Sequence, residues 1–292
     1  MWSEITEHIS RSTGQKFSSN DEFQHQSVGG GSINQAYLIG NKLRQYFVKT
    51  NAANKVAMFE AEAIALTQMY ATQTIRVPQL ICWGVASTSA YIVMEWLELG
   101  SSVNWELMAQ NLAALHRISS QTGFGWQQQN TIGSTPQINT WKQNWVEFLI
   151  QHRLGYQLQL ARRRGFSPSV TEQELFDTIP RFFDSYQPQP SMVHGDLWGG
   201  NAAFTRDREP VIFDPALYFG DREVDLAMTE LFGGFPAQFY QAYDRAFPLD
   251  PGYKQRKTLY NLYHILNHFN LFGGSYGQQA NRAIEQICTI SI

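Results

Sequence analysis

Three polar residues near the middle of the chain, Asp196, Asn201 and Asp214, most constrain what this sequence can fold into. Residues 192–201 read MVHGDLWGGN, and Asp214 follows a short apolar run. An acid, an amide and a second acid in this order suit phosphoryl transfer. One carboxylate takes the proton of the acceptor hydroxyl, and the other two groups hold magnesium ions. The spacing therefore predicts a site that transfers a phosphoryl group.

Protein kinases carry the same order of residues, as His-Arg-Asp-x-x-x-x-Asn followed by Asp-Phe-Gly. Here Gly195 replaces the arginine of the first motif, and Asp214-Pro215-Ala216 replaces the second. No long segment ending in Ala-Pro-Glu follows Asp214, so the sequence lacks the activation apparatus of protein kinases. These differences favour a small-molecule kinase.

Each of these residues also has an ordinary structural explanation. Asp196 suits a turn, Asn201 suits a cap, and Asp214 suits the end of a strand. A metallohydrolase with His194, Asp196 and Asp214 as metal ligands is a further alternative. It leaves the lysine and the glycines described next unexplained. His194 itself fits a bracing role in the loop better than a base.

A lysine at the end of a predicted strand fits the same chemistry. Lys49 closes the run Tyr-Phe-Val-Lys, and such a lysine reaches the phosphates of ATP when a carboxylate directs it. The next predicted helix offers Glu60 and Glu62, which point to different sides of the helix. We expect Glu62 to face inward, since Glu60 fits the solvent face more easily. An exposed strand end is the ordinary alternative for Lys49.

Gly29, Gly30, Gly31 and Ser32 lie between two predicted strands. Glycines permit positive φ and bring backbone N–H groups close to phosphate oxygens. A hairpin turn uses glycine as well, so the run alone is a weak signal. It is neither a Walker A loop nor a complete G-x-G-x-x-G. Together with Lys49 it predicts a phosphate-binding loop.

The apolar pattern predicts an α+β, two-lobed, protein-kinase-like fold. Residues 1–95 form a nucleotide-binding lobe with a small antiparallel sheet and one inserted helix, residues 96–102 form a hinge, and residues 103–292 form a larger, mainly helical catalytic and substrate lobe. The expected strands of the first lobe are 23–28, 36–39, 43–49, 80–85 and 91–95, with helices at 2–10 and 55–70. The expected helices of the second lobe are 103–118, 138–163, 171–186, 221–232 and 252–272, and two short apolar runs within 190–214 are expected to pair as strands.

Composition and charge exclude several classes of protein. Hydrophobic residues make up 43% of the 292 residues and charged residues 16%, which is typical of a globular chain. The net charge is −3, and the one dense basic run, 162–164, suits a solvated helix end better than nucleic-acid binding. Cys82 and Cys288, in apolar surroundings, predict free thiols. Without a secretion signal or a long apolar run, we expect a cytoplasmic monomer or dimer with no membrane partner.

The whole pattern resembles the fructosamine (ketosamine) kinases, relatives of the aminoglycoside and choline kinases. The resemblance runs nearly end to end and rests on residues 58–63, 132–141, 153–157, 194–201, 214–228 and 266–274. Its most discriminating part is the sequence Asp-Leu-Trp-x-Gly-Asn from Asp196 to Asn201. Trp198 is not expected in the aminoglycoside kinases.

The resemblance implies ATP- and Mg²⁺-dependent phosphorylation of the sugar 3-hydroxyl of a ketosamine, which is a glycated amine. The resulting 3-phosphate is unstable, so the family removes sugars from glycated proteins and metabolites. By resemblance, Asp196 is the base, Asn201 and Asp214 hold magnesium, and Lys49 with Glu62 orders the phosphates.

The resemblance also implies contacts for the adenine and the sugar. The adenine lies against the hinge, bonded to backbone groups of Met94, Glu95, Trp96 and Leu97. The sugar pocket is lined by Trp198, with Trp141, Asn139 and Arg153 as weaker candidates. Core packing is an equal alternative for Trp141. Many members carry cysteine after the glycines, where this chain has Ser32, so thiol-based control is not expected.

The family divides by sugar: bacterial and plant members prefer ribulosamines or erythrulosamines over fructosamines, and this sequence resembles the bacterial type. Two other functions stay open. One is an aminoglycoside- or choline-type kinase, although acidic residues are not massed in the helical lobe as an aminoglycoside would require. The other is a non-catalytic nucleotide-binding pseudokinase, although every expected catalytic position carries a chemically competent residue.

Overall fold

The computed structural model describes residues 1–17, 23–29, 33–41 and 43–290. The chain divides into two compact units. The first contains Met1–Asn104 and Ala203–Pro215, and the second contains Trp105–Ala202 and Ala216–Ile292. The sequence analysis expected two lobes that follow one another along the chain, whereas the first unit of the structure also contains Ala203–Pro215. A tertiary pairing explains this difference, because Leu99 forms a β-bridge with Thr205 and the Gly100 N–H donates to the Phe204 carbonyl at 2.9 Å.

The first unit is built on a five-stranded antiparallel sheet with the strand order β1-β2-β3-β5-β4. Its strands are β1 (Gln24–Val28), β2 (Gln35–Gly40), β3 (Gln45–Ala52), β4 (Leu80–Ala86) and β5 (Ser89–Glu95). All the strands predicted for the first lobe are present, with small shifts at their ends. The central strands β3 and β5 are the most buried, as their runs of β-branched and aromatic residues require.

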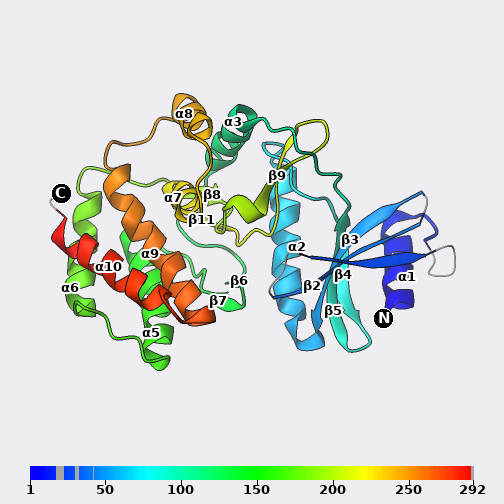
Figure 1. Ribbon diagram of the computed structural model, residues 1–292, viewed down its shortest axis with the longest axis horizontal. Coiled ribbons are helices and arrows are strands. Elements are labelled where there is room, and N and C mark those ends of the chain that lie inside the picture. The colour runs from blue at the N-terminus through cyan, green and yellow to red at the C-terminus, as the bar shows by residue number, and fades with distance from the viewer. Residues whose placement is uncertain (18–22, 30–32, 42, 291–292) are drawn as a thin grey trace. The chain divides into compact units, whose positions relative to one another are not determined.

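Two helices cover opposite faces of this sheet (Figure 1). They are α1 (Trp2–Thr13) and α2 (Val56–Ala71). Ile5 and Ile9 of α1 pack into one apolar cluster with Val48 of β3. The helix α1 ends at Gly14, whose φ of 68° is the left-handed value that glycine adopts easily at a helix end.

The segment 203–215 completes the first unit. It contains most of β9 (Ala202–Phe204) and all of β10 (Pro210–Ile212), which pair as a two-stranded sheet. The intervening turn is closed by the Thr205 N–H, which donates to the Glu209 carbonyl at 3.0 Å. The prediction that two short apolar runs within 190–214 pair as strands is confirmed by β9 and β10. The run 210–212 pairs with β9 through this short turn, and closing a short loop costs little entropy.

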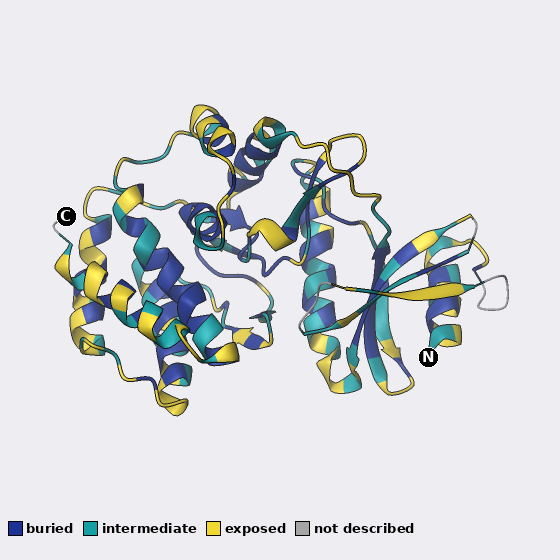
Figure 2. Ribbon diagram, viewed as in Figure 1, coloured by how far each residue is buried: buried dark blue, intermediate teal, exposed yellow. Residues whose placement is uncertain are grey.

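The second unit is mainly helical, as the sequence predicts. Its α-helices are α3 (Trp105–His116), α4 (Trp145–Phe148), α5 (Gly155–Arg163), α6 (Glu172–Thr178), α7 (Glu223–Leu231), α8 (Ala237–Ala246), α9 (Tyr253–Phe272) and α10 (Tyr276–Thr289). The long helix α9 is buried over most of its length (Figure 2), and α7, α5 and α10 pack against it. The helix α8 packs on α3. Neither α8 nor α10 was predicted, although each buries one stripe of residues at helical spacing.

Two of the predicted helices of this unit are shorter than expected. The predicted helix 138–163 begins only at Trp145, because the Asn144 side chain caps it by accepting the Glu147 N–H at 2.9 Å. Residues 149–154 then form a π-helical turn before α5. The predicted helix 171–186 ends as α6 and continues as a 3₁₀ turn, Ile179–Phe183, where Pro180 lacks the N–H that an α-helix needs.

Short strands frame the motif residues of the second unit. The strand β8 (Ser191–Val193) leads into residues 194–201 and pairs with β11 (Tyr218–Gly220). The strands β6 (Asn130–Ile132) and β7 (Thr135–Gln137) form a small hairpin that was not predicted. Among the residues that the structure describes, no helix is long and apolar enough to cross a membrane.

Candidate active site

Lys49, Glu62 and Asp214 meet inside the first unit. Lys49 comes from the buried part of β3, Glu62 from α2, and Asp214 from the segment after β10. Nζ of Lys49 lies 2.7 Å from Oε1 of Glu62 and also donates to Oδ1 of Asp214. The structure thus joins a lysine to two carboxylates that are distant in sequence. Such a lysine is fixed in direction and can face a phosphate.

Lys49 is buried, and its two anionic partners keep it charged. Burial alone would lower the pKa of Lys49, because it disfavours the charged form. The charges of Asp214 and Glu62, and their hydrogen bonds, outweigh burial and hold this pKa above its ordinary value. Lys49 therefore presents a permanent positive charge, which is what binding of phosphate oxygens requires.

Asp214 has an unusual backbone. Its φ of 60° lies in the left-handed region, which non-glycine residues seldom adopt. The strand before it is fastened to the rest of the first unit, because the Ile212 N–H donates to the Arg76 carbonyl at 3.0 Å. Strain of this kind persists only where neighbouring structure enforces it, and it is concentrated at functional sites. The side chain of Asp214 is 46% exposed, so one part of its carboxylate faces away from Lys49.

The expected hinge residues lie at the end of β5 and just after it. Met94 is buried, and Trp96 packs near Phe47 with 6.4 Å between ring centroids. The Glu95 N–H donates to the Gln79 carbonyl at 2.9 Å. The Glu95 carboxylate accepts from the Gln79 N–H at 2.9 Å and from Arg76 at 3.1 Å. The polar groups of Glu95 are thus engaged with protein partners.

Of the expected phosphate-binding loop, Gly29 follows β1 and is exposed. Gly30, Gly31 and Ser32 lie outside the described residues.

The segment 194–201 of the second unit is fastened by one buried carboxylate. Asp225 of α7 accepts the His194 N–H at 2.7 Å and the Gly195 N–H at 2.8 Å. It also accepts from Nε2 of His116, the last residue of α3, at 3.1 Å. Nδ1 of His116 lies 2.7 Å from the hydroxyl of Tyr243 in α8. Three helices therefore fix the backbone that carries Asp196.

The contacts of Asp225 also set its charge. Burial would raise the pKa of Asp225, but the hydrogen bond from His116, nearby charges and the Gly195 N–H outweigh burial. The pKa of Asp225 is therefore held below its ordinary value. The carboxylate stays charged and keeps accepting these hydrogen bonds.

Gly195 is required by the geometry of this segment. Its φ is +82°, and a Cβ there would lie 2.2 Å from the Ala216 carbonyl oxygen. His194 is fully buried, and its Nδ1 accepts the Asp196 N–H at 3.2 Å. His194 thus braces the segment, and Nδ1 is not available as a metal ligand. Among the described residues, no group of three or more His, Cys, Asp and Glu side chains is placed to hold a metal.

Asn201 orients Asp196. Its Nδ2 donates to the Asp196 carbonyl at 2.9 Å and to Oδ2 of Asp196 at 3.2 Å. Because the amide nitrogen is used in this way, its oxygen is the group left for a cation. An amide oxygen is a hard donor of the kind that Mg²⁺ takes, and so is the half-exposed carboxylate of Asp214 in the first unit. The donor chemistry of each residue, taken by itself, suits magnesium.

Trp198 is 38% exposed, and its indole is held by its neighbours. The ring lies against Gly200, where a Cβ would approach the indole to 2.4 Å. The edge of Phe232 contacts it with 6.4 Å between ring centroids. One part of the indole is covered in this way, and the remainder faces solvent.

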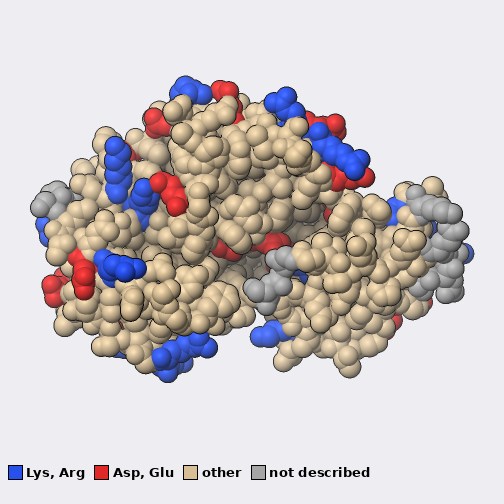
Figure 3. Space-filling view, viewed as in Figure 1, with Lys and Arg blue, Asp and Glu red and all other residues tan. Residues whose placement is uncertain are grey.

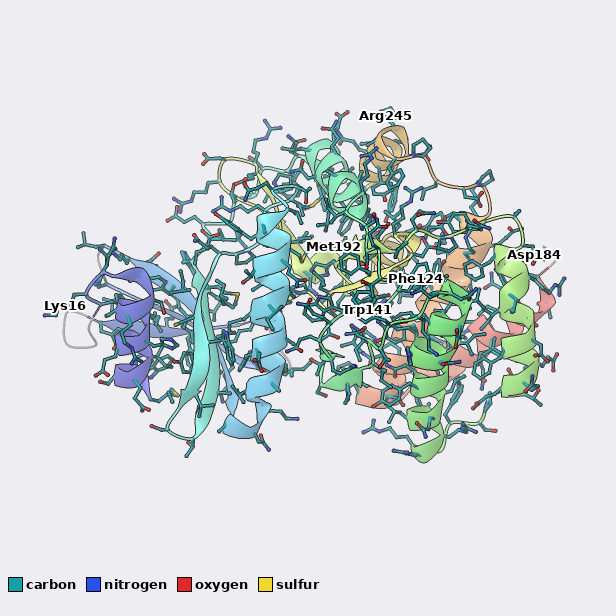
Figure 4. The ribbon with its side chains drawn as sticks, turned by 180° about the vertical axis from the view of Figure 1, so that it is seen from behind. Lys16, Phe124, Trp141, Asp184, Met192 and Arg245 are labelled. Carbon is teal, nitrogen blue, oxygen red and sulfur yellow. The ribbon has the colours of Figure 1, made fainter. Side chains whose placement is uncertain are left out.

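The three weaker substrate candidates have extensive contacts within the protein. Arg153 is buried; it donates to Oδ1 of Asn139 at 2.9 Å and stacks over the Tyr218 ring at 4.0 Å. Asn139 is fully buried. Trp141 (Figure 4) stacks on Phe219 with 6.1 Å between centroids. These contacts favour a packing role for all three.

Two residues with evident positioning roles were missed from the sequence. His116 reaches Asp225 across a long stretch of chain, and Arg76 joins Glu95 to Glu209. No local pattern marks either residue, because each acts through a partner distant in sequence. Asp225 braces the same segment by accepting the N–H groups of residues 194 and 195. Charged side chains of both signs are scattered over the visible face (Figure 3), and they form no basic stripe there.

Comparison with known proteins gives a consistent result. A family model described as fructosamine kinase matches residues 1–290. A protein of Synechocystis named "probable ketoamine kinase" is 53% identical over 99% of this chain and 97% of its own length. A chloroplastic protein-ribulosamine 3-kinase of Arabidopsis thaliana is 44% identical over 89% of this chain and 81% of its own.

Solved structures confirm the predicted fold class. The crystal structure of a candidate fructosamine-3-kinase from Haemophilus somnus has a TM-score of 0.90 at 29% identity, covering 98% of this chain and 97% of that one. A choline kinase from Streptococcus pneumoniae has a TM-score of 0.61 at 15% identity, covering 98% of both chains. The second similarity concerns the fold alone.

Proposed function

The chain belongs to the fructosamine kinase family and is a ketoamine kinase, a phosphotransferase; we propose that it transfers the phosphoryl group of ATP to the sugar 3-hydroxyl of ribulosamines or erythrulosamines in preference to fructosamines. The similarity to a named protein-ribulosamine 3-kinase is the observation that carries the choice of sugar and position. The unstable 3-phosphate would then decompose and release the amine.

In this proposal the first unit binds the nucleotide. Lys49, held by Glu62, binds the phosphates, and we assign the sequence from Gly29 to Ser32 to phosphate binding as well. The adenine lies along Met94–Leu97 and bonds to backbone groups. Since the N–H of Glu95 is engaged with Gln79, we assign the adenine bonds to backbone groups beyond it.

Asp196 acts as the base of the proposed reaction. Its carboxylate takes the proton of the 3-hydroxyl, and the hydrogen bond from Asn201 holds that carboxylate in place. Asn201 and Asp214 would hold magnesium, which neutralises the charge that develops on the phosphates. Asp225 keeps the loop backbone fixed, so that the base needs no reorganisation during the reaction.

Trp198 is the proposed platform for the sugar. It lies two positions after Asp196, and the exposed part of its indole offers an apolar face. Sugar rings and chains present C–H groups that pack on such a face. We assign Trp141, Asn139 and Arg153 no direct sugar contact, because each contacts other residues of the protein.

The test is Mg²⁺-dependent ATP consumption with ribulosyl-, erythrulosyl- and fructosyl-lysine, with choline and kanamycin as controls. We expect turnover on the ketosamines, highest with the shorter sugars. The Asp196→Asn variant should bind ATP and lose turnover by roughly 10²- to 10⁴-fold. Activity confined to a control substrate would contradict the proposal, and near-full activity of the variant would exclude Asp196 as the base.

A further inference from the structure

A chain of aromatic rings continues outward from Trp198 across the second unit. Phe232, at the end of α7, contacts Trp198, and its ring centroid lies 4.7 Å from that of His268. The ring centroid of His268, in α9, lies 5.7 Å from that of Phe272 and 5.1 Å from that of Tyr276 in α10. We refer to Phe232, His268, Phe272 and Tyr276 as the aromatic arm.

The aromatic arm is more exposed than a structural core requires. Phe272 is 58% exposed, the highest value for a large hydrophobic residue among those described in the second unit. Phe232, His268 and Tyr276 are half-buried. Neighbouring aromatic rings that remain partly in water are typical of binding sites, since burying them elsewhere would be favourable.

The centre of the aromatic arm carries a hydrogen-bond acceptor. Nδ1 of His268 lies 2.8 Å from the His264 carbonyl, which only accepts, so Nδ1 carries the proton. Burial lowers the pKa of His268, so the imidazole is neutral and Nε2 is an acceptor. Aromatic faces beside a neutral acceptor suit a ligand with a positive N–H group and an apolar chain.

A ketosamine presents such a group next to the reacting atom. Its amine nitrogen is attached to C1 and the phosphorylated hydroxyl to C3, so covalent geometry keeps the amine close to Asp196. The nitrogen is a cationic secondary amine, and its alkyl substituent leads away from the sugar. The hydroxyl-rich end of the sugar needs polar partners, whereas methylenes next to a cation match the aromatic arm.

We propose that the aromatic arm is the subsite for the amine side of the substrate, and that it selects long alkyl amines such as the lysine side chain. This inference rests on the proposed function. It makes a prediction that the proposed function does not: catalytic efficiency depends on the amine as well as on the sugar.

The experiment measures kcat/KM for one sugar on a series of amines: ribulosyl-ethylamine, ribulosyl-butylamine, ribulosyl-hexylamine and Nε-ribulosyl-lysine within a short peptide. For the parent protein we expect kcat/KM to rise by about fourfold per added methylene, the factor expected for burying a CH₂ group. Phe272→Ala and Tyr276→Ala should lose most on the longest amines and least on ethylamine. Phe272→Tyr should restore the dependence on chain length.

Tyr70→Ala is the matched control, because Tyr70 is another exposed aromatic residue, 46% exposed, on α2 of the first unit. It should keep the parent's dependence on chain length. If the parent protein had equal kcat/KM along the series, the aromatic arm would not be the amine subsite, and the proposed function would be unaffected. The same would follow if Phe272→Ala and Tyr276→Ala lost activity equally on every amine. Absence of turnover on every ketosamine would overturn both.

Discussion

Nζ of Lys49 and Oε1 of Glu62 lie 2.7 Å apart and join β3 to α2 within the first unit. Both side chains are nearly buried, so the pair is shielded from water and its geometry is narrowly defined. Asp214 adds a second carboxylate on the same lysine. The direction of Lys49 therefore depends on two partners, of which Glu62 is the more buried.

Replacing Glu62 by glutamine tests this dependence. The amide keeps the size of the side chain but removes its charge, so Lys49 is left with Asp214 as its anionic partner. We expect kcat/KM for ATP to fall by roughly tenfold or more, because the lysine loses its orientation. Glu60→Gln, on the same helix, is the matched control and should leave these kinetics close to the parent's. Equal losses in the two variants would contradict the role of the pair.

Asp225→Asn should weaken both stability and turnover. The buried carboxylate accepts two backbone N–H groups and His116, and an amide would turn its NH₂ group toward at least one of these donors. We expect a loss of about 2–4 kcal/mol in the free energy of unfolding, together with a lower kcat. Denaturant unfolding and steady-state kinetics measure the two effects. Asp177→Asn, on an exposed face of α6, controls for the loss of a charge.

The contribution of Asp225 to stability should also depend on pH. Its pKa in the folded protein lies below the unfolded value, which is about 3.9 for Asp. The contribution is therefore present above about pH 4 and is lost as pH falls through the folded-state pKa. The difference in unfolding free energy between the parent and Asp225→Asn should shrink as pH falls below about 4. If the difference in unfolding free energy grew in acid, the pKa of Asp225 would have to be higher in the folded protein than in the unfolded chain.

Gly195 and Gly165 separate two effects of a glycine substitution. Both have positive φ, +82° and +84°, but a Cβ has open space at Gly165 and meets the Ala216 carbonyl at Gly195. Gly165→Ala should cost about 1–2 kcal/mol of unfolding free energy with little change in kcat. Gly195→Ala should also lower kcat by roughly a hundredfold, since it displaces the segment that carries Asp196. Similar kcat values in both variants would rule out a special requirement at Gly195.

Arg76 should position the segment that leads to Asp214. Its guanidinium contacts Glu95 at 3.1 Å and Glu209 at 2.6 Å, and its carbonyl accepts the Ile212 N–H. Arg76→Ala should raise KM for ATP and the Mg²⁺ concentration needed for half-maximal rate, each by roughly tenfold. Arg206→Ala breaks the more exposed pair with Glu98 and serves as the control for charge. If both variants behave alike, the contacts of Arg76 have only a structural effect.

Much of the first unit could be predicted from local sequence. Runs such as Tyr46–Val48 have strand propensity, and the apolar residues of 55–70 recur at helical spacing, so these elements form largely where expected. The same holds for α9, which was predicted at 252–272 and spans Tyr253–Phe272. Local pattern was less informative at 138–144, where a cap decided where the helix begins. In α8 the buried residues Phe239, Ala242 and Tyr243 recur at helical spacing, and the prediction missed this signal.

The residues of the candidate active site also divide into those that the sequence predicts and those that it does not. The motif residues Asp196, Asn201 and Asp214 carry their chemistry in their identities and spacing, so the sequence by itself determined the class of reaction. It also determined the family, through residues that are adjacent in the chain, such as Trp198. The contact between Asn201 and Asp196 is equally local, since both residues belong to one loop.

Only the tertiary structure decided which distant residues support these groups. The bond of Lys49 to Asp214, the bonds of Asp225 to residues 194 and 195, and the rings of the aromatic arm each join separate elements. Periodicity tells which face of an element is buried, but not which residue of another element it will meet. That choice depends on the packing of whole helices and strands, and this packing moved residues 203–215 into the first unit against the order of the chain.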